Sequence, residues 1–93
     1  MTEESTRMHV VVSGQVQGVG FRQSTTQIAK SFPVTGWVKN LPSGNVEIVA
    51  EGTKTACSDF LASIRDRMFE YISDVECQWT EPTNEFETFE IQY

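Results

Sequence analysis

The sequence predicts an α+β domain: one mostly antiparallel sheet of four to five strands, with two helices on one face. Two observations predict this class. Segments in which apolar and polar residues alternate, typical of strands, flank two segments whose apolar residues recur every three or four positions, typical of helices. Along the 93 residues the order is strand, helix, strand, strand, helix, strand and a further strand. This is the split βαβ order of ferredoxin-like folds, and the length fits a single domain over residues 1–93.

The chain is expected to begin with a disordered tail and a first strand. Residues 1–7 (MTEESTR) are polar, and chain ends of this kind are often poorly ordered. From Met8 the residues alternate, so that Met8, Val10 and Val12 share one face of a strand that ends at Gly14.

A helix and a hairpin are predicted next. Apolar residues at helical spacing run from Phe21 to Phe32, and Pro33 ends the helix because proline disfavours helical geometry in the residue before it. Residues 35–40 (TGWVKN) and 45–52 (NVEIVAEG) are predicted strands. The segment between them, LPSG, contains the proline and glycine typical of a turn, so the two strands should form a hairpin.

The second half of the chain repeats a helix and a strand. An apolar stripe predicts a helix over residues 55–69, residues 73–79 (SDVECQW) alternate, and a last strand runs over residues 88–93. The helical crossover makes the first two strands parallel, and the third strand is expected between them and antiparallel to both. The glycine-rich segment that follows the first strand should therefore lie close to Asn40, at the end of the second.

Composition and charge exclude several classes of partner. Seven basic residues stand against thirteen acidic ones, a formal net charge of -6 that repels nucleic acid and anionic lipid. The chain begins with no signal-like apolar run, so we expect a cytoplasmic protein that binds no membrane, and we expect a monomer. Cys57 and Cys77 are expected to be reduced, half-buried thiols, with a single disulfide as the open alternative.

The stretch GQVQGVGFR, residues 14–22, favours an anion site. A glycine-rich turn between a strand and a helix can aim several backbone N–H groups at one point, where the helix dipole adds positive potential. Arg22 would lie in the first turn of that helix, where a cation is unfavourable unless an anion lies beside it. Its guanidinium can bind two phosphate oxygens at once. From the residues alone, a tight connection with a solvated arginine is the open alternative. The stretch is neither a Walker A loop nor a Rossmann fingerprint.

Three motifs in this half of the chain resemble those of the acylphosphatase family: SGQVQGVGFR, GWVKN and GNVEIVAEG, which lie between Ser13 and Gly52. The resemblance implies a ferredoxin-like enzyme that hydrolyses the carboxyl–phosphate bond of small acyl phosphates to a carboxylate and inorganic phosphate. It implies no metal and no other cofactor, and it implies that inorganic phosphate inhibits. By the same resemblance, Arg22 would bind the phosphate and Asn40 would position the attacking water. The phosphate-binding loop would comprise Gln15, Val16, Gln17, Gly18, Val19 and Gly20.

Two other functions stay open at this point. One is a non-catalytic ferredoxin-like module that binds a small anionic ligand in the same loop, and the other is a part of a larger maturation protein. Asn40 favours the enzyme, because a pure binding module has little use for a side chain that positions water. His9 is interpreted as a structural or surface group rather than a base, while Ser13 and Thr26 could line the site.

Overall fold

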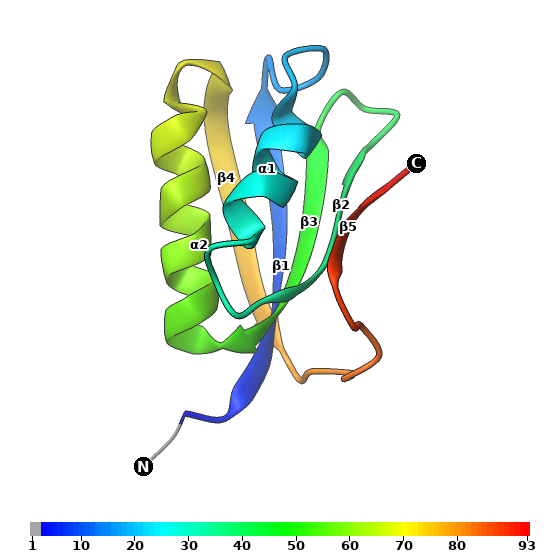
Figure 1. Ribbon diagram of the computed structural model, residues 1–93. Coiled ribbons are helices and arrows are strands. Elements are labelled where there is room, and N and C mark those ends of the chain that lie inside the picture. The colour runs from blue at the N-terminus through cyan, green and yellow to red at the C-terminus, as the bar shows by residue number, and fades with distance from the viewer. Residues whose placement is uncertain (1–2) are drawn as a thin grey trace.

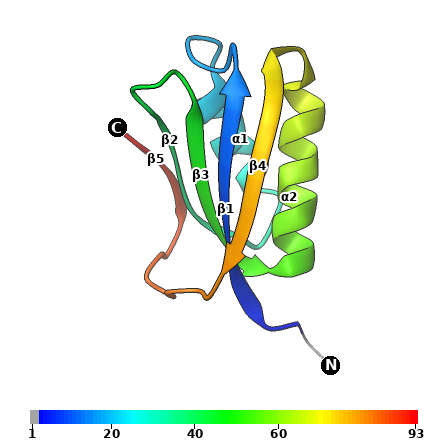
Figure 2. The same ribbon diagram turned by 180° about the vertical axis from the view of Figure 1, so that it is seen from behind.

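The computed structural model describes residues 3–93 and confirms the predicted ferredoxin-like α+β class. The strands are β1 (Ser5–Gly14), β2 (Thr35–Asn40), β3 (Val46–Thr53), β4 (Ile72–Thr80) and β5 (Phe89–Gln92). The helices are α1 (Phe21–Ala29) and α2 (Lys54–Arg67), and a short 3-10 helix (Phe69–Tyr71) precedes β4. Figure 1 shows both helices on one face of the sheet, and Figure 2 shows the other face, which no helix covers.

The sheet has the strand order β4-β1-β3-β2-β5. As predicted, β3 lies between β1 and β2 and is antiparallel to both. The last strand, β5, pairs in parallel with β2 at one edge. The carboxyl ends of β1 and β2 therefore lie at the same end of the sheet, beside the connection between β2 and β3 (Figures 1 and 2).

The core lies between the sheet and the two helices. The predicted face of β1 is buried together with the facing residues of β3, since Val10 and its cross-strand partner Ile48 are both fully inaccessible. The predicted stripe of α2 is also confirmed: Phe60 is fully buried, with its ring centroid 6.1 Å from that of Phe32 and 5.2 Å from that of Phe89. The helix α1 ends at Ala29, so Phe32 reaches this aromatic cluster from the turn after the helix.

The predicted disordered tail over residues 1–7 is corrected by the structure. Residues 5–7 belong to β1 and pair with β3, with Arg7 opposite Glu51. The Glu3 carboxylate accepts hydrogen bonds from the backbone N–H and the hydroxyl of Thr55, at 3.1 and 2.5 Å, in the first turn of α2. These bonds hold the pKa of Glu3 below its usual range. The polar residues at this end of the chain gave no apolar pattern that would predict a strand, because their side chains form polar contacts with the rest of the fold. Residues 1–2 lie outside the described residues.

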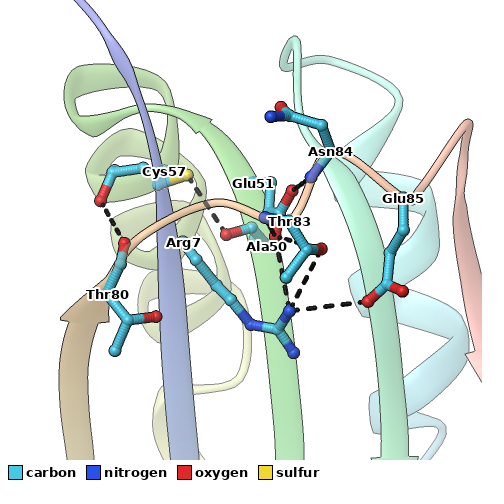
Figure 3. A network of polar contacts seen from close by, with 9 residues as sticks. Arg7, Ala50, Glu51, Cys57, Thr80, Thr83, Asn84 and Glu85 are labelled. Atoms are coloured by element: carbon cyan, nitrogen blue, oxygen red, sulfur yellow. Dashed lines mark hydrogen bonds and ion pairs between the residues drawn. The ribbon is translucent and has the colours of Figure 1, made fainter.

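A buried carboxylate fixes the connection between β4 and β5. The Glu51 side chain, 5% exposed, accepts hydrogen bonds from the backbone N–H groups of Thr83 and Asn84, both at 2.9 Å, and from the Thr83 hydroxyl at 3.1 Å. The Arg7 guanidinium lies 3.5 Å from Glu51 and 3.7 Å from Glu85 (Figure 3). This network holds residues 81–88 against β3, at the end of the sheet opposite to Asn40.

The two thiols differ in exposure. Cys57 is buried and Cys77 is exposed on the edge strand β4, and both are free, as expected; the prediction that both are half-buried was wrong. Burial raises the pKa of Cys57 to about 11. Neither helix in residues 3–93 combines the length and the apolar character that crossing a membrane requires.

Candidate active site

The loop between β1 and α1 is anchored by its apolar side chains. Val16 is 1% exposed in the core, and Val19 packs against the same core. The backbone N–H of Gln15 donates to the Tyr71 carbonyl at 2.9 Å, which ties the start of the loop to the segment before β4. Gly18 and Gly20, on either side of Val19, are exposed.

Two glycines give the loop a backbone shape that other residues rarely adopt. Gly18 has a φ of 79° and Gly20 a φ of 76°, both in the left-handed region. A Cβ atom built on either glycine would meet no atom within 4 Å, so the space in front of them is open. Among the described residues, none of the backbone N–H groups of residues 16–20 donates to a protein acceptor. The loop therefore presents unpaired donors to an open space.

Helix α1 starts at this loop with a positive charge. Gly20 is its N-cap, no side chain caps the helix, and its first turn contains no acidic residue. Arg22 lies in that first turn, and within the described part of the chain it forms no salt bridge. Its Cζ atom lies 5.0 Å from the centre of the Tyr93 ring. The helix dipole and the guanidinium both favour an anion at this point.

Asn40 reaches the same place from a different part of the chain. It is the last residue of β2 and pairs with Val46 across the hairpin. A cleft of about 290 Å³ is lined by Gly18, Gly20, Arg22, Asn40, Ile91 and Tyr93, among others. The prediction that the glycine-rich segment and Asn40 lie close together is thus confirmed.

The predicted phosphate loop divides into two groups of residues. Val16, Gly18 and Gly20 line the cleft, whereas Gln15, Gln17 and Val19 do not. The Gln15 N–H is also occupied by the Tyr71 carbonyl, so it is not one of the unpaired donors. The Gln17 side chain donates to two backbone carbonyls.

Sequence reasoning missed four residues of the cleft wall: Phe21 and Gln23 on α1, and Ile91 and Tyr93 from the end of the chain. Ile91 and Tyr93 line the cleft because β5 pairs in parallel with β2, beside Asn40. The alternation of Phe89, Ile91 and Tyr93 predicted the strand, but it contained no signal for the strand with which β5 pairs. Tyr93 lies at the mouth of the cleft and is 98% exposed.

The remaining polar candidates do not line the cleft. His9 lies 2.6 Å from the Glu47 carboxylate on the open face of the sheet. Thr26 donates to the Gln23 carbonyl at 2.8 Å, and neither Thr26 nor Ser13 lines the cleft. In residues 3–93, no three His, Cys, Asp or Glu side chains are grouped so that they could hold a metal ion.

The fold and the cleft together define a ferredoxin-like α+β protein. At the start of its first helix, unpaired backbone donors, an arginine and an asparagine lie around one cleft. The model of the acylphosphatase family matches residues 8–91. A curated acylphosphatase of Anaeromyxobacter dehalogenans is 38% identical over 88 residues, which cover 94% of this chain and 95% of that protein. The chain therefore belongs to the acylphosphatase family.

Two further comparisons agree with this assignment. An acylphosphatase of Methanospirillum hungatei is 52% identical over 58 residues, covering 62% of this chain and 64% of that protein. The crystal structure of acylphosphatase from Bacillus subtilis has a TM-score of 0.87 and 32% sequence identity, over 95% of this chain and 99% of that chain. The matched segments of the first curated relatives cover from 50% to 64% of those relatives' length.

Proposed function

We propose that this chain hydrolyses the carboxyl–phosphate bond of small acyl phosphates, releasing a carboxylate and inorganic phosphate without a metal ion. The observation that supports this most directly is the shared cleft: Arg22 and Asn40, from α1 and β2, line one cavity together with the glycines of the loop. Membership of the acylphosphatase family supports the same reaction.

The phosphate group would bind to the loop and to Arg22. The unpaired N–H groups of residues 16–20 and the start of α1 supply hydrogen-bond donors, and the guanidinium adds a full positive charge. The site would hold the three non-bridging oxygens, on which charge must be stabilised during phosphoryl transfer. These groups make a local positive region in a chain whose net charge is -6.

The reaction needs little further chemistry from the protein. The leaving group is a carboxylate, whose conjugate acid has a pKa near ~4, so no general acid has to protonate it. A water molecule attacks the phosphorus, the phosphorus–oxygen bond to the acyl group breaks, and the proton of the water passes to a phosphate oxygen. Asn40 would hold this water in line, because its amide both donates and accepts a hydrogen bond.

Substitution of Asn40 by alanine tests the proposal. The wild-type chain should release phosphate from a simple acyl phosphate in excess EDTA. In Asn40→Ala, kcat and kcat/KM should fall together, by roughly a hundredfold as for loss of one preorganised donor, while inorganic phosphate still binds. The melting temperature, the affinity for phosphate and the turnover should be measured on one preparation.

Three outcomes would contradict the proposal in different ways. Phosphate binding without any hydrolysis by the wild-type chain would identify a binding module rather than an enzyme. Activity that is lost in EDTA and restored by a divalent metal would overturn the metal-free reaction. A lower melting temperature with unchanged turnover in Asn40→Ala would mean that Asn40 only stabilises the end of β2.

A further inference from the structure

The Gln17 side chain joins the phosphate-binding loop to the connection between β2 and β3. Its Nε2 donates to the carbonyl of Leu41 at 2.8 Å and to the carbonyl of Asn45 at 2.9 Å. These two hydrogen bonds cross 24 and 28 positions of the chain. Both N–H groups of one amide are thus used on two carbonyls of one turn.

The turn that accepts these bonds is itself closed by backbone contacts. The Leu41 N–H donates to the Asn45 carbonyl at 2.8 Å, and the Gly44 N–H donates to the Leu41 carbonyl at 3.1 Å. Gln17 therefore binds the two residues that close residues 41–45 into a compact unit. Because Asn40 directly precedes Leu41, whatever holds Leu41 also limits where Asn40 can lie.

The main chain of Gln17 lies next to the proposed anion site. In the chain, Gln17 directly precedes Gly18, whose backbone lines the cleft. Val16, directly before Gln17, is buried, and Val19, two positions after it, packs against the core. The main chain at Gln17 is therefore held in place. The two hydrogen bonds of Gln17 thus connect the loop that would hold the phosphate to the strand end that would hold the water.

We infer that Gln17 is a positioning residue, which sets Asn40 at the correct place relative to the phosphate-binding loop. The inference rests on the proposed function. It explains why an amide stands at this position: two carbonyls need two N–H donors without an accompanying negative charge. A carboxylate would offer no donor and would add charge beside the anion site.

The test is a double-mutant cycle between Gln17 and Asn40. Gln17→Met keeps the length and the neutral charge of the side chain but removes both donors. In the wild-type background its kcat should fall by about tenfold, the scale of one or two lost hydrogen bonds, with a smaller change in the affinity for inorganic phosphate. In the Asn40→Ala background Gln17→Met should change kcat by less than about twofold, because its effect acts through Asn40.

A matched control and a second variant complete the test. Gln27→Met makes the same exchange at an exposed position of α1 and should leave kcat unchanged. Gln17→Asn keeps the amide but withdraws it by one methylene, and it carries the same cycle if Gln17→Met does not fold. The melting temperature of each variant is measured alongside its kcat.

The outcomes separate this inference from the function on which it rests. Equal losses of kcat from Gln17→Met in both backgrounds would overturn the inference, because Gln17 would then act independently of Asn40. A lower melting temperature with unchanged kcat would also overturn it and would leave Gln17 a purely stabilising contact. If the wild-type chain hydrolyses no acyl phosphate, or if Asn40→Ala keeps full turnover, the proposed role of the site fails, and the inference fails with it.

Discussion

Arg22 holds a positive charge in the first turn of α1, where the helix dipole makes a cation unfavourable. Within the described residues no carboxylate forms a salt bridge with it, and the nearest aromatic partner is the exposed ring of Tyr93. An isolated charge in this position is best explained by an anion that binds between the guanidinium and the loop. The shape of the guanidinium then matters as much as its charge.

We expect Arg22→Lys to lose most of the activity while the fold stays intact. Lysine keeps the charge but lacks the planar pair of donors that can bind two phosphate oxygens. Loss of one charge-assisted hydrogen bond should lower kcat/KM by about tenfold to a hundredfold. Steady-state kinetics and the melting temperature check this, with Arg65→Lys on the exposed side of α2 as the matched exchange. Near-normal kinetics in Arg22→Lys would make Arg22 a surface charge.

The residues of the site differ in how well the sequence alone could predict them. Arg22 and Asn40 stand in motifs, and the predicted topology already brought their elements together. The bridge made by Gln17 could not be predicted, because its acceptors are backbone carbonyls, which any residue carries and which leave no mark in the sequence. Tyr93 was missed for another reason: its contact with Arg22 depends on the position of an edge strand.

At the scale of elements, the connection between β4 and β5 depends on one buried carboxylate. Burial raises the pKa of Glu51, but the N–H groups of Thr83 and Asn84, the Thr83 hydroxyl and Arg7 together outweigh it, so this pKa lies below its usual range. A lowered folded-state pKa stabilises the fold above the unfolded value of about 4.3, and this contribution is lost as the pH falls through the folded value.

We expect Glu51→Gln to destabilise the protein at neutral pH and much less in acid. The variant keeps one acceptor oxygen but places an amide group among donors, which should cost about 1–3 kcal/mol of unfolding free energy at pH 7. The difference from the wild type should shrink as the pH falls below about 4.3, because protonated Glu51 then resembles glutamine. Denaturant unfolding across this range measures it, with Glu76→Gln on the exposed face of β4 as control. A difference that stays constant with pH would contradict the assignment.

The same variant should leave kcat at neutral pH nearly unchanged, because Glu51 and Asn40 lie at opposite ends of the hairpin. Glu51 pairs with Thr35 at the start of β2, whereas Asn40, at its end, pairs with Val46. The Glu51 network therefore lies at the end of the hairpin that is remote from Asn40.

Elements with a clear period were predictable, and elements that depend on contacts between distant residues were not. Alternation located β1 and β3, and the apolar stripe located the first helix, although α1 ends at Ala29 and not at Phe32, the residue before Pro33. The pattern also placed Val49 on the face opposite to the helices, where burial is not expected, yet Val49 is 1% exposed. Its cross-strand neighbours there are His9 and Trp37, whose large side chains flank it on that face. The pairing of β5 with β2 likewise depends on packing that no local pattern records.

At the scale of the whole molecule, the net charge constrains how the proposed anion site can work. The net charge of -6 opposes any anion at long range, and salt screens this repulsion within about 10 Å at 0.1 M. Binding must therefore come from the unpaired donors and Arg22 at short range. Because these groups belong to the loop and to α1, a bound anion should stabilise the folded chain as a unit.

We expect inorganic phosphate to raise the melting temperature through this site. At a concentration tenfold above the dissociation constant, a ligand specific for the folded state adds about 1.4 kcal/mol to the unfolding free energy. For a domain of this size that corresponds to a rise of about 5–10 °C.

Phosphate also stabilises proteins without a specific site, because it is excluded from their surfaces, so the informative quantity is the difference between the wild type and Arg22→Gln. The wild type should respond more strongly, its extra stabilisation should grow with the logarithm of the phosphate concentration above the dissociation constant, and the dissociation constant fitted to this growth should match the inhibition constant of phosphate in the hydrolysis assay. If both proteins respond equally and linearly up to high phosphate, the stabilisation is non-specific and the loop with Arg22 binds no anion.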